Sequence, residues 1–263
     1  MNKQERVALA IKDVVSKMMD RVMENVLVND PFVKEKHHAS KPLYAALVPD
    51  EIFKGSHFER RFATPFGGVW ERLAQVVAIE AHGNCSMGHT VNGTVGTESL
   101  RRIQEVLNKL EHSAKGIDKV KPNWKIELEY IIQGGGEPIP VSVTCDIFIH
   151  NETTNKKYAF ELDKMPSDNF QAKASKEKIF KLLAMNLPQV DFAFFALPYN
   201  EIKNYQDSLL TKWFDIQEDE SVLIGDSFWN LIGGEGIYNN IMKEITLFGE
   251  SSKKQICEEY LDF

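Results

Sequence analysis

The stretch TCDIFIHNETTNKKYAFELDK, residues 144–164, decides the fold that the sequence predicts. Two runs in which apolar and polar residues alternate flank the polar segment NETTNK, a pattern typical of a β-hairpin. If the turn is residues 151–156, cross-strand pairing puts Asp146 opposite Glu161. Alternation of side chains then brings Asp146, Glu161 and Asp163 to the same face of the hairpin.

The two faces of the predicted hairpin differ in polarity. One face is expected to carry the apolar side chains Val141, Val143, Cys145, Ile147, Ile149, Tyr158, Phe160 and Leu162. The other is expected to carry the three acids together with Ser142, Thr144, Phe148, His150, Lys157 and Ala159. A slip of one residue would exchange the two faces, so the hydrophobic pattern favours this register.

Acidic side chains gathered on one face indicate a cation. Opposed carboxylates destabilise a sheet, and a divalent ion between them reverses the sign of that interaction. Two carboxylates, a carbonyl oxygen and water suit Mg²⁺, whose use in enzymes is hydrolysis or transfer at phosphate. The alternative is a solvated hairpin face that happens to be acidic.

Size and composition fit a globular protein. The chain has 263 residues, 43% of them hydrophobic, and no apolar run reaches the roughly eighteen residues of a membrane span. The charged amphipathic N-terminus argues against a secretory signal, and the three cysteines form no CxxC pair, so we expect reduced thiols in a cytoplasm. The net charge of −7 argues weakly against nucleic acid, but four lysines lie within residues 173–181.

Hydrophobic periodicity predicts helices around a central sheet, in one α/β domain built on a mixed sheet. Helices are expected over residues 4–27, 64–83, 98–116, 173–186 and 226–234. Strands are expected over residues 124–132, in the hairpin, and at 190–198 and 222–225. The GGG at 134–136 is expected to be a plain turn, because no helix and lysine follow it as in a phosphate-binding loop.

The hairpin and its surroundings resemble the PD-(D/E)XK nucleases, in which an Asp on one strand is followed about fifteen residues later by acid-x-Lys. More narrowly, RFATPFGGVWERLAQVVA, EAHG, KASKEKIFKLLAMN, FFALPYN and VLIGDSFWNLIGGEGIY resemble the type II restriction endonucleases that recognise GGNCC, over residues 55–240. The resemblance implies a restriction-endonuclease-like fold. It also implies a single nuclease domain, 1–263, with a catalytic core at about 65–200 and helical additions at both ends.

The same resemblance implies site residues. Asp146 and Glu161 correspond to metal ligands, and Glu71 corresponds to the first-motif acid that often completes the site. The third position is normally a lysine, which orients the attacking water and stabilises the charge of the pentavalent phosphate. This chain has Asp163 there, of the opposite charge.

Three accounts of the missing lysine remain open. In the first account Lys164 supplies the cation. In the second a lysine of the following helix, Lys173 or Lys176, supplies it. In the third no residue replaces the lysine, and the chain is an inactive variant, natural or engineered. We favour the last, because a single-residue change explains an otherwise ordinary motif. Asp163→Lys should then raise Mg²⁺-dependent cleavage by orders of magnitude.

The leading function is a Mg²⁺-dependent endonuclease that cuts both strands of a short palindromic site in double-stranded DNA, acting as a homodimer because a symmetric site matches a two-fold symmetric protein. The candidate DNA-binding residues are Arg60, Arg61, Lys164, Lys173 and Lys176. One alternative is a DNA-binding module without cleavage. Another is an acidic α/β protein whose hairpin holds a structural cation. Histidine metal sites are disfavoured, because neither HxH nor HExxH occurs.

Overall fold

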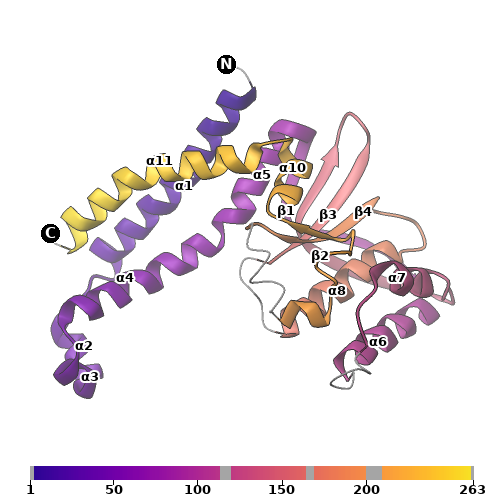
Figure 1. Cartoon of the computed structure of the whole chain (residues 1–263), viewed down its shortest axis with the longest axis horizontal. Helices are drawn as coiled ribbons and strands as arrows, with labels where there is room; N and C mark the ends of the chain where they lie inside the picture. The colour runs from indigo at the N-terminus through magenta and orange to yellow at the C-terminus, as the bar shows by residue number, and fades with distance from the viewer. Residues whose placement is uncertain (1–2, 113–119, 164–168, 200–208, 262–263) are drawn as a thin grey trace. The chain divides into compact units, whose positions relative to one another are not determined.

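The computed structural model of the chain describes four segments, residues 3–112, 120–163, 169–199 and 209–261. The chain divides into two units, each of which we describe by itself (Figure 1). The helical unit comprises Met1–Leu73 and Asn239–Phe263, and the sheet unit comprises Ala74–Tyr238. The helical additions expected at the two ends of the chain therefore belong to one unit.

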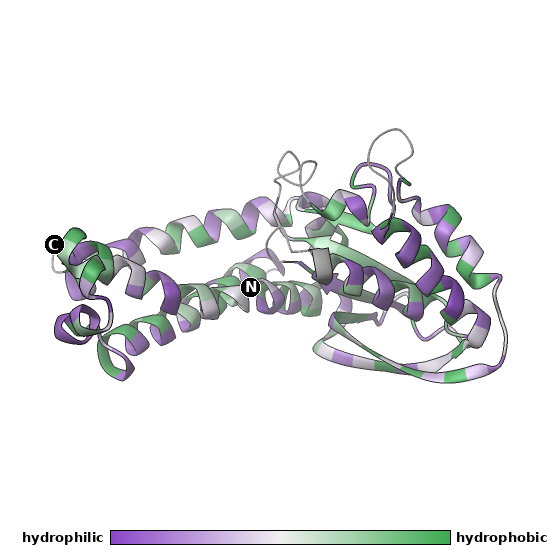
Figure 2. Cartoon of the chain, turned by 90° about the horizontal axis from the view of Figure 1, so that it is seen from below, coloured by the Kyte–Doolittle hydropathy of each residue, from purple (hydrophilic) through white to green (hydrophobic). Residues whose placement is uncertain are grey.

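Among the described residues, the helical unit contains four α-helices in full, parts of α5 and α11, and two short π-helices. Their bounds are α1 Lys3–Glu24, η1 Asn25–Asn29, α2 Lys34–Ser40, α3 Pro42–Leu47, α4 Asp50–Gly67, α5 Val69–His82, α11 Ile237–Gln255 and η3 Ile256–Leu261. The predicted first helix is confirmed, since α1 buries Val7, Ile11, Val14, Met18 and Val22 at helical spacing. Figure 2 shows polar and apolar residues interspersed along its long helices, as expected of amphipathic elements.

The helical unit has a small aromatic core at its buried histidine. His57 Nδ1 bonds the Tyr260 hydroxyl at 3.0 Å, and that hydroxyl donates to the Lys54 carbonyl at 2.9 Å. The hydroxyl has one proton, so Nδ1 of His57 is the donor of the first bond. Burial and the Arg61 charge lower the pKa of His57, while the Asp30 charge opposes this shift. The neutral imidazole is therefore the stable form in the fold.

The sheet unit is built on five strands in the order β1-β2-β3-β4-β5, with bounds β1 Gly83–Gly96, β2 Pro138–Asn151, β3 Lys156–Leu162, β4 Phe192–Leu197 and β5 Val222–Ile224. The first three strands are antiparallel, and β3, β4 and β5 are parallel. The predicted mixed α/β sheet is confirmed. The helices and turns of the unit are α6 Thr97–Glu111, α7 Trp124–Ile132, α8 Asn169–Leu183, η2 Leu209–Lys212 and α10 Asp226–Gly233.

Helix α8 connects the parallel strands β3 and β4 and packs against the sheet (Figure 1). Helices α6 and α7 contact α8 in turn, and α6 also contacts β1. The helix predicted over 173–186 is confirmed by α8, in which Ala172, Ile179 and Phe180 are buried. Helix α8 covers the hairpin face that carries Glu161, which was predicted to be the polar face.

The predicted sorting of hairpin side chains is wrong in part. Val143 and Cys145 pack in the same core cluster as Ala159, a cluster that does not include Phe160. The four consecutive β3 residues Ala159, Phe160, Glu161 and Leu162 are all buried, so both faces of this strand are covered. The polarity of the side chains therefore does not distinguish one face from the other.

Residues 124–132 form helix α7 and not the predicted strand. Asn123 caps the helix, its Oδ1 accepting the Ile126 amide at 3.1 Å. The buried residues are Trp124 and Ile131, seven apart, whereas Ile126 is 66% exposed. The sequence alternates as a strand would, but tertiary packing uses the helical period.

Strand β1 was not predicted from the sequence, because its four glycines lower the β-propensity of the segment. Gly96 at its end approaches the expected turn at GGG, where a Cβ on Gly96 would lie 1.9 Å from the Gly135 carbonyl oxygen. That carbonyl accepts the backbone N–H groups of Glu98 and Ser99 at the start of α6. The turn is confirmed, and it also satisfies free N–H groups of a helix N-terminus.

The helix predicted over 64–83 is two helices. Pro65 lies inside the end of α4, and Gly68 separates α4 from α5, which ends before Gly83 as expected. The stop expected at Gly116 lies outside the described residues. None of the described helices is long and apolar enough to cross a membrane. All three cysteines are free thiols.

Candidate active site

The β2–β3 hairpin has the predicted register. Ile147 pairs with Phe160, and the pairing continues to the turn. There Asn151 Oδ1 accepts the amide of Thr153 at 3.0 Å, and Asn155 adopts a φ of +55°, which asparagine tolerates better than most residues. Local turn chemistry and the apolar pattern therefore agree on one alignment of the strands.

Asp146 lies one residue beyond Ile147, at the end of this ladder. Its Oδ2 accepts the backbone amide of Leu162 at 2.8 Å, directly after Glu161 in β3. The Asp146 side chain is half-buried. This hydrogen bond fixes the Asp146 carboxylate across the strands from Glu161, as the predicted register requires.

Glu161 is buried, with 4% of its surface exposed. Its Oε2 accepts a hydrogen bond from Lys178 Nζ on α8 at 2.8 Å. Its Oε1 is buried and has no hydrogen-bond partner in the part of the chain that the structure describes. A buried carboxylate oxygen without a partner is costly, so this atom is suited to a ligand.

The electrostatics of Glu161 reflect its burial. Burial raises the pKa of the Glu161 carboxyl to about 7; the hydrogen bond from Lys178 opposes this shift and the Asp146 charge adds to it. Two neighbouring carboxylates that share one low-dielectric site disfavour double ionisation. A bound cation would favour the ionised form of both.

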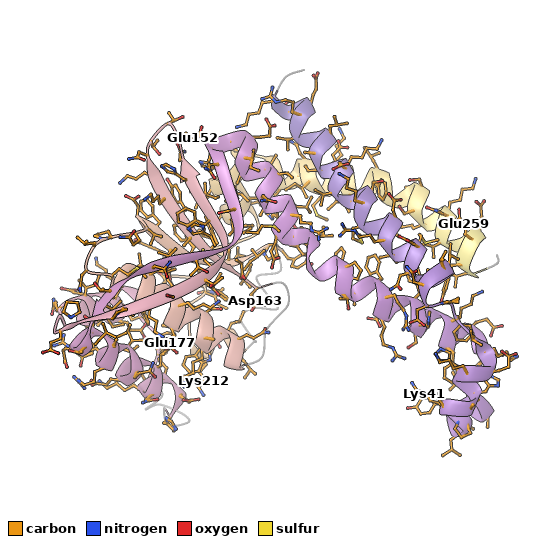
Figure 3. The ribbon with its side chains drawn as sticks, turned by 180° about the vertical axis from the view of Figure 1, so that it is seen from behind. Lys41, Glu152, Asp163, Glu177, Lys212 and Glu259 are labelled. Atoms are coloured by element: carbon orange, nitrogen blue, oxygen red, sulfur yellow. The ribbon has the colours of Figure 1, made fainter. Side chains whose placement is uncertain are left out.

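Asp163 directly follows β3 (Figure 3). Its backbone amide donates to the Ala196 carbonyl at 2.9 Å, so the chain still follows the parallel ladder with β4 at this residue. Asp163 is half-buried. Lys164, the first candidate for the missing cation, lies outside the described residues.

The three acids do not form a complete metal cage. Within the described segments, no group of three or more His, Cys, Asp or Glu side chains is arranged to hold a metal ion. Asp146 and Glu161 are therefore a two-carboxylate site. Such a site fits Mg²⁺, which retains several waters and commonly uses one or two protein carboxylates with substrate phosphate.

Comparison with known proteins shows the family of the chain. The family model described as "Type II restriction endonuclease, HinfI" matches residues 8–249 of the chain. The chain belongs to the HinfI family of type II restriction endonucleases. Membership supports a nuclease that binds DNA, and it fits the mixed sheet flanked by helices.

Curated relatives of this HinfI-family chain include three restriction enzymes from Herpetosiphon aurantiacus. The type II restriction enzymes HgiBI and HgiEI are each 21% identical over 234 residues, which is 84% of this chain and 81% of theirs. The type II restriction enzyme HgiCII is 22% identical over 227 residues, 84% of this chain and 82% of its own. The similarity therefore extends through most of both chains.

Two of the predicted lysines have other partners. Lys176 is fully buried, donates to the Trp213 carbonyl and pairs with Glu127 at 2.6 Å. Its ammonium is thus not presented to a DNA phosphate, and we remove Lys176 from the site. Lys173 pairs with Glu111 at 2.5 Å on the partly exposed side of α8.

The remaining predicted residues belong to the helical unit. Arg60 is exposed on α4, and Arg61 pairs with Asp30. Glu71 is half-buried in the first turn of α5. The roles of Arg60 and Arg61 in DNA binding and of Glu71 in the active site stay predictions.

The structure adds one residue that sequence reasoning did not select, Lys178. The sequence shows it as one of four lysines on α8, and a lysine-rich helix face is normally solvated. Only the approach of α8 to β3 distinguishes Lys178, because its ammonium reaches Glu161.

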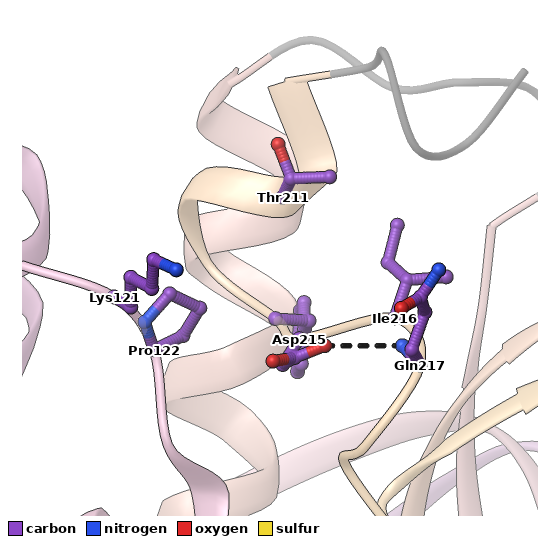
Figure 4. Close-up of a pocket in the computed structure, with 7 residues that line it drawn as sticks. Lys121, Pro122, Thr211, Asp215, Ile216 and Gln217 are labelled. Atoms are coloured by element: carbon purple, nitrogen blue, oxygen red, sulfur yellow. Dashed lines mark hydrogen bonds between the residues drawn. The ribbon is translucent and has the colours of Figure 1, made fainter.

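A pocket of about 370 Å³ elsewhere in the sheet unit is lined by Lys121, Pro122, Thr211, Phe214, Asp215, Ile216 and Gln217 (Figure 4). Asp215 Oδ1 accepts the Gln217 amide at 3.2 Å within it. Neither Asp146 nor Glu161 is among the described residues of this lining, so the pocket is separate from the carboxylate pair.

Proposed function

We propose that the chain is a Mg²⁺-dependent endonuclease that hydrolyses a phosphodiester bond in each strand of a short palindromic DNA site. The observation that carries the proposal is the position of Asp146 across the hairpin from Glu161, fixed by the hydrogen bond from the Leu162 amide, in a chain of the HinfI family. The resemblance to nucleases that recognise GGNCC makes a GGNCC-like site the first sequence to test.

Mg²⁺ would be held by Asp146 and Glu161. The Leu162 amide orients Asp146, and Glu161 offers the buried Oε1 that has no partner in the described chain. When bound, the ion supplies Lewis-acid stabilisation of charge at the phosphate and favours deprotonation of water. The two residues contribute fixed positions and a charge that complements the cation.

The reaction is an in-line displacement at phosphorus. A bond forms between a water oxygen and phosphorus, the bond to the 3′ oxygen breaks, and that oxygen leaves with a proton. The products are a 5′-phosphate and a 3′-hydroxyl. Asp163 places a further carboxyl where the resemblance implies a lysine, so a cation from elsewhere in the chain is needed for full rate.

A homodimer follows from the proposed substrate, since one active site per strand of a palindrome calls for two-fold symmetry. A cytoplasmic location is part of the proposal, because the substrate is DNA and the three free thiols fit a reducing compartment. Arg60 and Arg61 of the helical unit remain proposed DNA contacts.

A second candidate function is specific DNA binding without cleavage, which Asp163 at the usual lysine position favours. The acidic α/β protein with a structural cation is the remaining alternative. It predicts no salt-dependent retardation of duplex DNA, whereas a DNA-binding protein releases counterions and binds less tightly as salt rises.

The deciding experiment incubates supercoiled plasmid carrying GGNCC sites with the full chain and Mg²⁺, followed by sequencing of the ends. Linear products with defined ends, absent in EDTA and with Asp146→Asn, are the expected result. Retardation of the plasmid without nicks would instead support the binding module. No cleavage and no retardation would contradict both.

A further inference from the structure

We propose that Lys178 on α8 supplies the active-site cation that β3 lacks, so that this chain is a working nuclease whose lysine comes from the helix. This inference rests on the proposed function. It differs from the account favoured by the sequence alone, in which Asp163 marks an inactive variant.

The charges around the hairpin require a cation. Asp146 lies on β2, Glu161 lies on β3 and Asp163 directly follows β3. A DNA phosphate adds further negative charge. In the low dielectric of a partly buried site, repulsion between such groups is stronger than in water. One ammonium beside the carboxylates reduces this repulsion before the phosphate arrives.

Lys178 meets this need by its position. Its Nζ lies 2.8 Å from Glu161 Oε2, yet the Lys178 side chain is 39% exposed while that of Glu161 is 5% exposed. The ammonium therefore lies at the boundary between the buried carboxylate and solvent. A phosphate that reaches Glu161 from solvent would meet Lys178 there.

The other lysines of α8 have different partners. Lys173 pairs with Glu111, and Lys181 pairs with Glu177 one turn earlier on the same helix. The buried Lys176 is enclosed by aromatic rings, its Nζ 5.1 Å from the centre of the Phe214 ring. Among the four lysines of this helix, Lys178 is the one paired with a proposed metal ligand.

The chemical role follows from this geometry. As a protonated ammonium with three donors, Lys178 can hold Glu161 and also donate to a non-bridging phosphate oxygen. It stabilises the added negative charge as water attacks and the bond from phosphorus to the 3′ oxygen breaks. Lys178 keeps its proton throughout, and the proton of the attacking water passes to solvent.

The test compares five forms of the full chain: wild type, Lys178→Met, Asp163→Lys, the double variant of these two, and Lys181→Met as matched control. The rate of plasmid cleavage is measured in Mg²⁺ under single-turnover conditions with saturating enzyme. Affinity for a duplex of the same site is measured in Ca²⁺. Far-UV circular dichroism and thermal unfolding check the fold of each.

We expect Lys178→Met to slow cleavage by on the order of 10²–10³-fold, the usual effect of losing one such donor. Its affinity for the duplex should stay within about threefold of wild type, and Lys181→Met should match wild type in both. Asp163→Lys in the Lys178→Met background should restore cleavage at least tenfold, because it returns a cation to the same carboxylates. A purely structural Lys178 would not be rescued in this way.

Each other outcome is decisive. Wild-type rates with Lys178→Met would overturn the inference and leave the nuclease assignment intact. A wild type that does not cleave, together with an Asp163→Lys variant that does, would also overturn the inference, since Lys178 would then not suffice for cleavage. A Lys178→Met variant that misfolds and that Asp163→Lys does not rescue would assign Lys178 a structural role. Absence of cleavage by both wild type and Asp163→Lys would contradict the proposed function itself.

Discussion

Replacing Lys176 with methionine should strongly destabilise the sheet unit and leave the salt dependence of DNA binding unchanged. The Lys176 side chain is completely buried, and the Glu127 side chain with which it pairs at 2.6 Å is 11% exposed. The ammonium also donates to the Trp213 carbonyl. Methionine fills similar volume but leaves the carboxylate of Glu127 without its cation.

The magnitude follows from burial. Breaking a buried ion pair by removing one partner costs roughly 3–5 kcal/mol, because the other charge stays uncompensated. Since about 1 kcal/mol shifts the unfolding temperature of a domain of 150–250 residues by roughly 2–4 °C, the decrease should be on the order of 10 °C. Burial also lowers the pKa of Lys176, with the Glu127 charge opposing, so part of the cost of a buried ammonium is already present in wild type.

Removing both charges should recover most of the loss. Lys176→Met with Glu127→Leu replaces the pair by apolar groups, a change that is often neutral or stabilising. The matched control is Lys181→Met, which breaks an i,i+4 pair with Glu177 and should cost no more than about 0.5 kcal/mol.

The assay is thermal unfolding followed by circular dichroism, with the salt dependence of duplex affinity measured in parallel. A structural Lys176 shifts the unfolding temperature and leaves the slope of log affinity against log salt unchanged. A Lys176 that contacts phosphate, as the sequence suggested, would instead lower that slope by about one. Unchanged stability together with a reduced slope would refute the structural reasoning.

Three further predictions concern single sites. Gly96→Ala should lower the unfolding temperature, because the added Cβ would lie 1.9 Å from the Gly135 carbonyl oxygen. Gly55→Ala is the control: this glycine is exposed on a helix with nothing within 4 Å of an added Cβ, so the substitution should raise stability by about 0.5–1 kcal/mol. A change of the same sign in both variants would contradict the packing argument. His57 has a pKa lowered chiefly by burial, so stability that is fully present above about pH 6.5 should be lost as pH falls through the lower folded-state value. Urea unfolding at several pH values should show this slope in wild type and a shallower one in His57→Asn, and equal slopes would argue against burial as the cause. Saturating Mg²⁺ without DNA should stabilise wild type, by about 2.7 kcal/mol at one hundred times the dissociation constant, but not Glu161→Gln; an equal gain in both would place the ion elsewhere.

Local sequence patterns were sufficient to predict the elements whose apolar residues recur with a clear helical or strand period. The β2–β3 register follows from alternation and from the asparagine-rich turn, and α1, α6 and α8 follow from apolar residues at helical spacing. These signals lie within about twenty neighbouring residues. The carboxylate pair Asp146 and Glu161 could be predicted for the same reason, since register alone brings the two together.

Elements that depend on distant partners could not be predicted. Strand β1 has a glycine-rich sequence and is a strand because β2 pairs along its length. Helix α7 alternates like a strand, and the burial of Trp124 and Ile131 against other helices selects the helix. In both cases long-range packing outweighs a weak local preference.

By itself, then, the sequence determined the hairpin, the two acids across it and the lysine-rich helix that follows. Only the tertiary structure decided which lysine has which environment: Lys176 is sealed among aromatic rings, and Lys178, two residues later, reaches Glu161 from the solvent edge. A shift of two residues turns a helix by about 200°, so neighbouring lysines face opposite surroundings. The angle at which α8 packs on the sheet fixes those surroundings, and that angle is set by contacts spread over the whole unit.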